Sequence, residues 1–215
     1  MKTTEIIEEL KAKGDPKNVK GMARFGINPK KAVGVSVTEL RKMAKKIGKD
    51  HQIAIELWKS GIHEARILAS MIDIAEVVRE EQMEEWVKDF DSWGICDQVC
   101  MNLFDQTDIA FKKAFEWSSR KDEFVKRAGF SLMAVIAVHD KNAEDKELMK
   151  FFPIIKREST DERNYVKKAV NWALRQIGKR NSKLKREAMK TAHEILKIDS
   201  KSARWIAHDA IRELR

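Results

Sequence analysis

Trp93 and Asp97 are the residues whose types and spacing offer the clearest chemistry in this sequence. They stand four residues apart in a stretch with helical periodicity, so both side chains are expected on one face of a helix. A carboxylate there can stabilise positive charge that develops during a reaction and can orient an attacking water molecule. An indole face attracts cations by about 0.5–2 kcal/mol, depending on desolvation. Although a tryptophan at helical spacing more often packs in a core, the pair is suited to a positively charged reacting group.

Two residues of later helical segments extend this candidate site. Arg127 opens one such segment, and its guanidinium is suited to holding a phosphate. Trp172 lies in the next segment and supplies a second indole. Basic residues follow it, and four of them are candidate contacts to a nucleic-acid backbone: Arg175, Lys179, Arg180 and Lys183.

Positive charge is concentrated near the C-terminal end of the chain. The net charge is +9, and residues 161–215 contain 15 Lys and Arg against 7 Asp and Glu. A run of charges is usually a solvated helix face, but a regional excess raises the local potential and attracts a polyanion. Nucleic acid is the commonest such partner. Because phosphate contacts carry no base-sequence information, we expect largely sequence-independent binding that weakens with salt.

Several other chemistries lack support. Cys96 and Cys100 form no disulfide framework and fit a reducing compartment, which predicts a cytoplasmic protein, associated with the nucleoid when it is bound to DNA. The sequence has no zinc-site spacing, so we expect no metal and no cofactor; the five scattered histidines are His51, His63, His139, His193 and His208. The motifs GxxxxGK(S/T), GxGxxG and GxSxG are absent. No stretch approaches 18 uncharged residues, so neither export nor a membrane partner is expected.

The elements that must position these residues are helices. Three prolines and nine glycines leave long stretches with an apolar period of 3.6 residues, which predicts an all-α chain. Capping side chains mark three helix starts: Ser36, either Asp91 or Ser92, and Asp161. Glycines mark three helix ends: Gly48, Gly61 and Gly178. Four tryptophans are expected to pack between helices: Trp58, Trp86, Trp117 and Trp205.

Five helical segments resemble one another, and their starts lie 31, 32, 41 and 37 residues apart: Ile62–Ile72, Trp93–Phe104, Val125–His139, Val166–Gly178 and Ala203–Leu214. A preceding helix is expected before three of them, at Gln82–Phe90, Asp108–Ser119 and Lys185–Leu196. Helix pairs that recur at this spacing predict a HEAT-like α-solenoid. We expect one repeat domain over residues 1–215, best supported over 34–215, whose second helices line a concave, basic DNA-binding face.

Four stretches carry a resemblance to a known family: the segment from Gly34 to Asp73, FDSWGICDQVC, EFVKRAGFSLMAV and NYVKKAVNWALRQIGKRN. They resemble, in order, the AlkD-type DNA alkylation repair family of HEAT-like glycosylases. In that family an indole and a carboxylate four residues apart, the arginine of the next repeat and a later tryptophan form the lesion site. The matching residues here are Trp93, Asp97, Arg127 and Trp172. The resemblance implies a monomeric glycosylase that excises cationic 3-methyladenine and 7-methylguanine from double-stranded DNA, without a deep base-binding pocket.

The chain departs from the family pattern at two places. Gly94 replaces the Asp that often follows the first tryptophan, which could loosen the start of that helix. The segment MARFGINPKKAVGV is shorter than the usual N-terminal opening, and within it Phe25 is the match to an aromatic that contacts the lesion. Two alternatives therefore stay open: a non-catalytic scaffold that binds nucleic acid or protein, and a member that binds damaged DNA without excision. Asp97 separates the glycosylase from the scaffold, because a phosphate-binding scaffold gains nothing from a carboxylate on its basic face.

Overall fold

The computed structural model describes residues 1–215 and is helical, without β-strands. This confirms the predicted all-α class. The chain divides into two compact units, Met1–Thr107 and Asp108–Arg215, which we describe separately. A single repeat domain over the whole chain stays a prediction.

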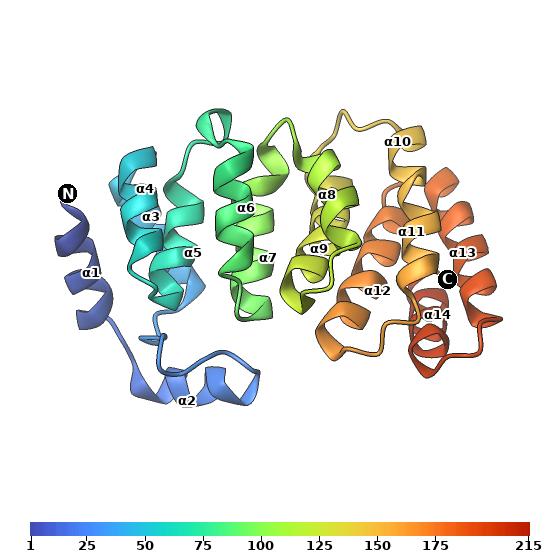
Figure 1. The fold of residues 1–215 in the computed structure, drawn as a ribbon, viewed down its shortest axis with the longest axis horizontal. Helices are drawn as coiled ribbons and strands as arrows, with labels where there is room; N and C mark the ends of the chain where they lie inside the picture. The colour runs from blue at the N-terminus through green and yellow to red at the C-terminus, as the bar shows by residue number, and fades with distance from the viewer. The chain divides into compact units, whose positions relative to one another are not determined.

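The first unit consists of helix pairs preceded by two N-terminal helices (Figure 1). α5 packs against α3, α4 and α7, so it occupies the centre of this unit. The elements are α1 (Thr3–Ala12), α2 (Pro16–Arg24), α3 (Val37–Ile47), α4 (His51–Lys59), α5 (His63–Ile72), η1 (Ala75–Val77), α6 (Glu80–Lys88), α7 (Trp93–Asn102) and η2 (Phe104–Gln106).

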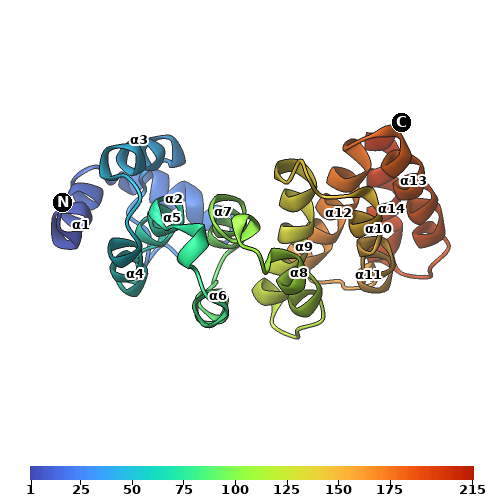
Figure 2. The same ribbon diagram turned by 90° about the horizontal axis from the view of Figure 1, so that it is seen from above.

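The second unit is built around α12, which packs against α9 on one side and α14 on the other (Figures 1 and 2). α8 covers α9, and α13 packs against both α12 and α14. The elements are α8 (Ala110–Ser118), α9 (Glu123–His139), α10 (Asp145–Met149), α11 (Phe151–Glu158), α12 (Asn164–Lys179), α13 (Ser182–Leu196) and α14 (Lys201–Leu214).

The predicted second helices of the pairs are confirmed as α5, α7, α9, α12 and α14, each beginning within two residues of its expected start. The predicted preceding helices are confirmed as α6, α8 and α13. The second helices form much of the core: α5 and α9 are buried over most of their length. Because they pack on one another within each unit, equivalent positions of successive repeats come close together.

Most of the expected helix boundaries are confirmed. Ser36 accepts a hydrogen bond from the Glu39 amide at the start of α3, and Ser92 caps α7 in the same way. Gly48 and Gly61 follow helices with φ of 82° and 70°, a backbone conformation that glycine adopts without steric cost. Local chemistry is therefore sufficient to end these helices.

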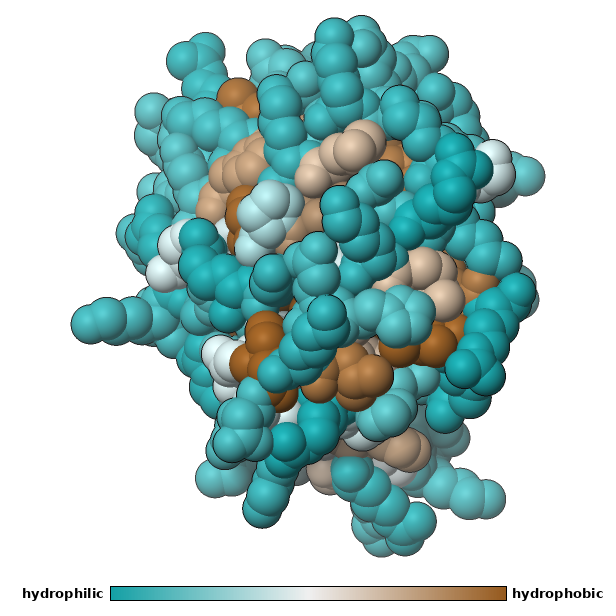
Figure 3. All heavy atoms as spheres, turned by 90° about the vertical axis from the view of Figure 1, so that its right-hand side faces the viewer, coloured by the Kyte–Doolittle hydropathy of each residue, from teal (hydrophilic) through white to brown (hydrophobic).

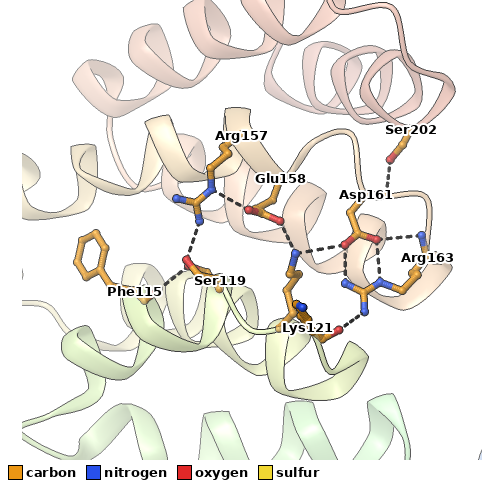
Figure 4. A network of polar contacts seen from close by, with 10 residues as sticks. Phe115, Ser119, Lys121, Arg157, Glu158, Asp161, Arg163 and Ser202 are labelled. Carbon is orange, nitrogen blue, oxygen red and sulfur yellow. Dashed lines mark hydrogen bonds and ion pairs between the residues drawn. The ribbon is translucent and has the colours of Figure 1, made fainter.

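The prediction that Asp161 caps a helix is wrong. α12 begins three residues later, at Asn164, because the Asp161 carboxylate is engaged in a network that joins three segments of the second unit (Figure 4). Arg163 pairs with that carboxylate at 2.6 Å and donates to the Lys121 carbonyl oxygen at 2.6 Å. Lys126 Nζ lies 2.5 Å from the Glu158 carboxylate and 3.5 Å from that of Asp161. The network ties α9 to the loop between α11 and α12.

The prediction that Gly178 ends a helix places the end of α12 to within one residue, but its reason, a turn at the glycine, is wrong. α12 continues through Gly178 to Lys179, and Gly178 is buried against the last two helices. A Cβ atom here would lie 2.8 Å from the Ala188 Cβ and 2.9 Å from the Leu214 Cδ1. The glycine is thus required by close helix packing and not by a turn.

Three of the four tryptophans expected in the packing are confirmed there. Trp58 and Trp86 stack with ring centroids 4.0 Å apart, and Trp117 is fully buried. Trp205 was expected to be packed as well and is not: 40% of it is exposed, and Lys167 Nζ lies 5.2 Å from its ring centroid. The face of the C-terminal helices in Figure 3 is mostly hydrophilic with apolar side chains in small patches, as expected for the last repeat of an array.

Candidate active site and DNA-contact residues

α7 presents Trp93 and Asp97 on its accessible side. Ser92 Oγ accepts a hydrogen bond from the Ile95 amide, so the helix begins at Trp93 despite Gly94 in its first turn. The opposite side of α7 is buried through Ile95 and Val99, whereas Trp93 and Asp97 are only partly buried. Gly94 therefore does not displace the start of this helix, and the expectation that it loosens the helix stays a prediction.

Trp93 and Asp97 both line a cavity of about 790 Å³ inside the first unit. Its walls are α2, residues 27–37, the start of α5 and the first turns of α7. Apolar side chains form much of the lining, with Ile27, Val35 and Ile67 among them. The candidate carboxylate of Asp97 therefore lies on the wall of this cavity.

The cavity is closed on one side by α2, and a hydrogen bond joins this helix to Trp93. The indole Nε1–H of Trp93 donates to the Phe25 carbonyl oxygen at 2.8 Å, at the C-terminal end of α2. The Phe25 ring is 66% exposed and stands at the edge of the same cavity. The structure therefore places Phe25, the N-terminal aromatic matched to the family, next to the Trp93 indole.

A buried carboxylate holds the loop that carries α2. Glu64 of α5 accepts hydrogen bonds from the Val33 amide at 2.9 Å and the Gly34 amide at 2.7 Å. Gly34 has φ of 89°, and a Cβ atom here would lie 2.2 Å from the Asp15 carbonyl oxygen. Only glycine allows this close approach, which positions α2 over the cavity.

His63, the first residue of α5, is a cavity residue that the sequence analysis missed. It is 4% exposed and lies beside Gly94, where a Cβ atom would be 3.4 Å from its Cε1. Burial lowers the pKa of the His63 imidazole below its ordinary value of 6.5, against the opposing charges of Glu64 and Asp91. The repeat spacing contained a signal: 31 residues separate Ile62 from Trp93, so His63 and Gly94 are equivalent positions.

The two thiols lie behind the site, on the buried side of α7. Cys96 and Cys100 do not form a disulfide, and neither has exposed surface. Burial, together with the neighbouring Cys96 thiol, raises the pKa of the Cys100 thiol well above its usual range. Both cysteines therefore belong to the packing of the helix that carries Asp97.

Arg127 and Trp172 belong to the second unit. Arg127, on α9, is 6% exposed and its Nη1 donates to the Tyr165 carbonyl oxygen at 2.6 Å. Trp172 lies partly exposed near the middle of α12. The four lesion-site candidates are thus divided between the units: Trp93 and Asp97 line one cavity, and Arg127 and Trp172 lie on adjacent helices.

Arg180 occupies an internal position in the second unit. Its guanidinium donates to four carbonyl oxygens at the end of α9 and in the following loop, those of Ala137, Asp140, Lys141 and Ala143. This arrangement stabilises the C-terminal end of a helix, where carbonyl groups lack partners. Its assignment as a DNA contact stays a prediction.

The other three basic candidates have acidic partners within the chain. The pairs are Arg175 with Asp209 at 3.2 Å, Lys179 with Glu213 at 3.0 Å, and Lys183 with Asp145 at 3.8 Å. Partly exposed pairs of this kind contribute about 0–1 kcal/mol each, so DNA phosphates could compete for the cations. A second basic segment was missed: residues 11–31, around α2, contain seven Lys and Arg against one Asp.

The fold is that of a HEAT-like repeat protein. It matches, with a TM-score of 0.83 and 21% identity, a solved structure from a new family related to the HEAT-like repeat DNA glycosylases, with affinity for branched DNA structures. The match covers 99% of this chain and 95% of the other. The chain belongs to the family of DNA alkylation repair enzymes, whose model matches residues 6–214. The resemblance predicted from the sequence is thereby confirmed.

Other comparisons add little. An engineered protein gives a TM-score of 0.41 at 15% identity, covering 82% of this chain and 90% of its own. A designed armadillo repeat protein gives 0.38 at 14% identity, covering 83% and 92%. No curated protein matches the chain in sequence. None of the helices has the length and apolar character needed to span a membrane.

Proposed function

We propose that this protein is a monofunctional DNA glycosylase that binds double-stranded DNA and excises cationic N3- or N7-alkylated purines. The observation that carries the proposal is the pair formed by Trp93 and Asp97 on the wall of one cavity, on a helix whose start is fixed by Ser92. Membership of the DNA alkylation repair family supports it. We further propose that the protein acts as a monomer in the cytoplasm, without a cofactor.

The chemistry that this site would perform needs no general acid. An alkyl group at N3 or N7 makes the purine cationic, so the electrons of the glycosidic bond pass to the ring and the base leaves neutral. Positive charge then develops on the deoxyribose, and the Asp97 carboxylate stabilises it. A water oxygen bonds to C1′, and its proton passes through the carboxylate to solvent.

The remaining candidates would select and hold the substrate. The indole faces of Trp93 and Trp172 favour positive charge, on the alkylated base or on the sugar, by about 0.5–2 kcal/mol each. Arg127 would hold a backbone phosphate through a guanidinium that is already oriented by the Tyr165 carbonyl oxygen. Basic residues on the second helices would form a concave face that follows the duplex without reading its sequence.

Binding of branched DNA without excision is the second candidate function. The solved relative with a TM-score of 0.83 has affinity for branched DNA structures, and we extend that property to this chain only as a hypothesis. The basic segment around α2 favours it, since it adds positive charge far in sequence from residues 161–215. A protein with two separate basic segments could contact two arms of a junction.

One experiment separates the two candidates. Single-turnover release of 7-methylguanine from duplex DNA should be detectable with the wild type and fall about 100–1000-fold in Asp97→Asn, while duplex affinity is retained. Asp199→Asn is the matched control, because this carboxylate is 99% exposed and pairs only with Arg204. The glycosylase proposal would be refuted if the wild type released no base. Binding of branched DNA would then be the supported function if three-way and four-way junctions bound more tightly than linear duplex.

A further inference from the structure

We propose that Trp205 of α14 is a stacking platform for an unpaired DNA base, and that the cations around it hold the phosphates on either side of that base. Trp205 belongs to the second unit, whereas Trp93 and Asp97 belong to the first. The inference rests on the DNA binding that both candidate functions share, and nothing in it depends on base excision.

Trp205 is the most exposed of the six tryptophans. It is 40% exposed, whereas three tryptophans are buried and the other two are partly buried. The last repeat of an array normally presents a polar outer surface, and an indole there forgoes the stabilisation that burial would give. Single exposed apolar side chains are nevertheless common on proteins, so the surroundings of this ring decide what it binds.

The exposed face of α14 consists of this indole and of hydrogen-bond donors. Residues three or four positions apart form a stripe along the helix: Lys201, Arg204, Trp205, His208 and Arg212. The opposite face packs against α12 and α13 through small and branched apolar residues such as Ala203 and Ile206. A protein partner would be expected to meet an apolar centre with a polar rim, and here no apolar side chain extends the indole within the stripe.

The neighbouring helix α12 adds two cations beside the ring. Lys167 Nζ lies 5.2 Å from the Trp205 ring centroid, and Lys168 is exposed on the same helix. An exposed cation–π contact is weaker than the stacking of a base on an aromatic ring, so a base can take over the ring face. The ammonium of Lys167 then remains next to the nucleotide, where it can pair with a phosphate.

The acidic residues of this surface are already paired, so the charge left over is positive. Three carboxylates lie here, and each has a basic partner: Asp199 with Arg204 at 2.9 Å, Asp209 with Arg175 at 3.2 Å, and Glu213 with Lys179 at 3.0 Å. Lys168 and Lys201 are exposed and have no acidic partner within the chain. Uncompensated lysines around an indole favour a polyanion that also carries aromatic groups, and nucleic acid is such a ligand.

The exposed ring selects unpaired bases over a duplex. In a duplex each base is covered on both faces by its neighbours, and only base edges are accessible in the grooves. A single-stranded segment, a flap or the branch point of a junction presents free base faces. Because every base has such a face, stacking on Trp205 would be tolerant of sequence.

The test compares binding of an oligothymidylate of about ten nucleotides with binding of a fully paired hairpin duplex, using the full-length protein. Trp205→Leu should weaken oligothymidylate binding about tenfold and leave hairpin binding within about twofold, whereas Trp205→Phe, which keeps an aromatic ring, should retain most of the affinity. Lys168→Gln should also weaken oligothymidylate binding and lower its salt slope by about one. Lys190→Gln, at an exposed lysine of α13, is the matched control and should change neither.

Photocrosslinking to the wild type provides a second measurement that needs no variant. An oligothymidylate with 5-bromouracil in place of thymine should crosslink to Trp205, as located by mass spectrometry of the digested protein. The inference would be overturned by equal affinity of Trp205→Leu and the wild type, by crosslinks at other residues only, or by a wild type that does not bind the oligothymidylate.

These outcomes are distinguishable from those of the proposed function. If the wild type releases 7-methylguanine from duplex DNA but Trp205→Leu binds the oligothymidylate as tightly as the wild type, the stacking platform fails and the glycosylase stands. If Trp205 crosslinks and its loss weakens binding while no base is released, the platform stands and the glycosylase fails.

Discussion

Gly129 and Gly94 lie in two second helices, and the same substitution should affect them in opposite directions. A Cβ atom at Gly129 would lie 2.5 Å from the Ser118 amide nitrogen, 2.9 Å from its Cα and 3.0 Å from the Ala114 carbonyl oxygen. The shortest of these distances is roughly 1 Å less than an ordinary van der Waals contact. All three atoms belong to the backbone of α8, which cannot rotate aside as a side chain can. At Gly94 the nearest atoms are side-chain carbons of His63 and Ile27, both at 3.4 Å.

The magnitudes follow from two opposing contributions. Replacing a helical glycine by alanine stabilises the helix by up to about 1 kcal/mol, whereas overpacking a close contact costs about 1–3 kcal/mol or more. Gly129→Ala should therefore lower the free energy of unfolding by roughly 1–2 kcal/mol, and Gly94→Ala should raise it by about 0.5–1 kcal/mol. At about 2–4 °C per kcal/mol, both changes are measurable as shifts of Tm.

The assay is thermal unfolding of both variants with amide hydrogen exchange to locate the change. Exchange should accelerate in α8 and α9 for Gly129→Ala and should not accelerate in α7 for Gly94→Ala. A Gly129→Ala protein as stable as the wild type would refute the close contact between α8 and α9, and with it the packing that positions Arg127.

Three further predictions concern pH, lesion chemistry and charge. Because burial lowers the pKa of His63 below 6.5, the unfolded chain binds more protons just below that pH, so the free energy of unfolding should decrease as the pH falls through about 6.5. Chemical denaturation at several pH values should show a smaller decrease in His63→Gln. Single-turnover assays in one sequence context should show release of 7-methylguanine but little of hypoxanthine, since no proton donor is assigned; equal rates would contradict the mechanism. The double substitution Lys179→Ala and Lys183→Ala should weaken binding to damaged and undamaged duplex equally, and salt titrations should show the slope of log affinity against log salt reduced by up to about 2. Arg180→Ala should mainly lower Tm.

The second helices could be predicted from the sequence because their signals are local. An apolar period of 3.6 residues and a capping side chain such as Ser36 or Ser92 act within a few residues of each other. Trp93 and Asp97 could be identified through the family resemblance by an equally local pattern, because the two residues lie within about one helical turn of each other. Local signals are also sufficient at Gly48 and Gly61, where positive φ follows from the turn itself.

The failures have tertiary causes. Gly178 has the composition of a helix end, but its lack of a side chain serves the approach of Ala188 and Leu214 from other helices. Asp161 has a capping side chain, but Arg163 and Lys126 compete for it. His63 could not be recognised as a cavity residue from its neighbours in sequence, because α2 and α7 create the cavity around it.

The burial of the cysteines has a consequence if the protein acts on alkylated DNA as proposed. Thiolates are the side-chain groups that electrophiles attack most readily, and attack requires both ionisation and access. Cys96 and Cys100 are the only cysteines of the chain; neither is accessible, and the raised pKa keeps Cys100 protonated. The helix that carries Asp97 should thus remain unmodified by the same reagents that generate alkylated purines.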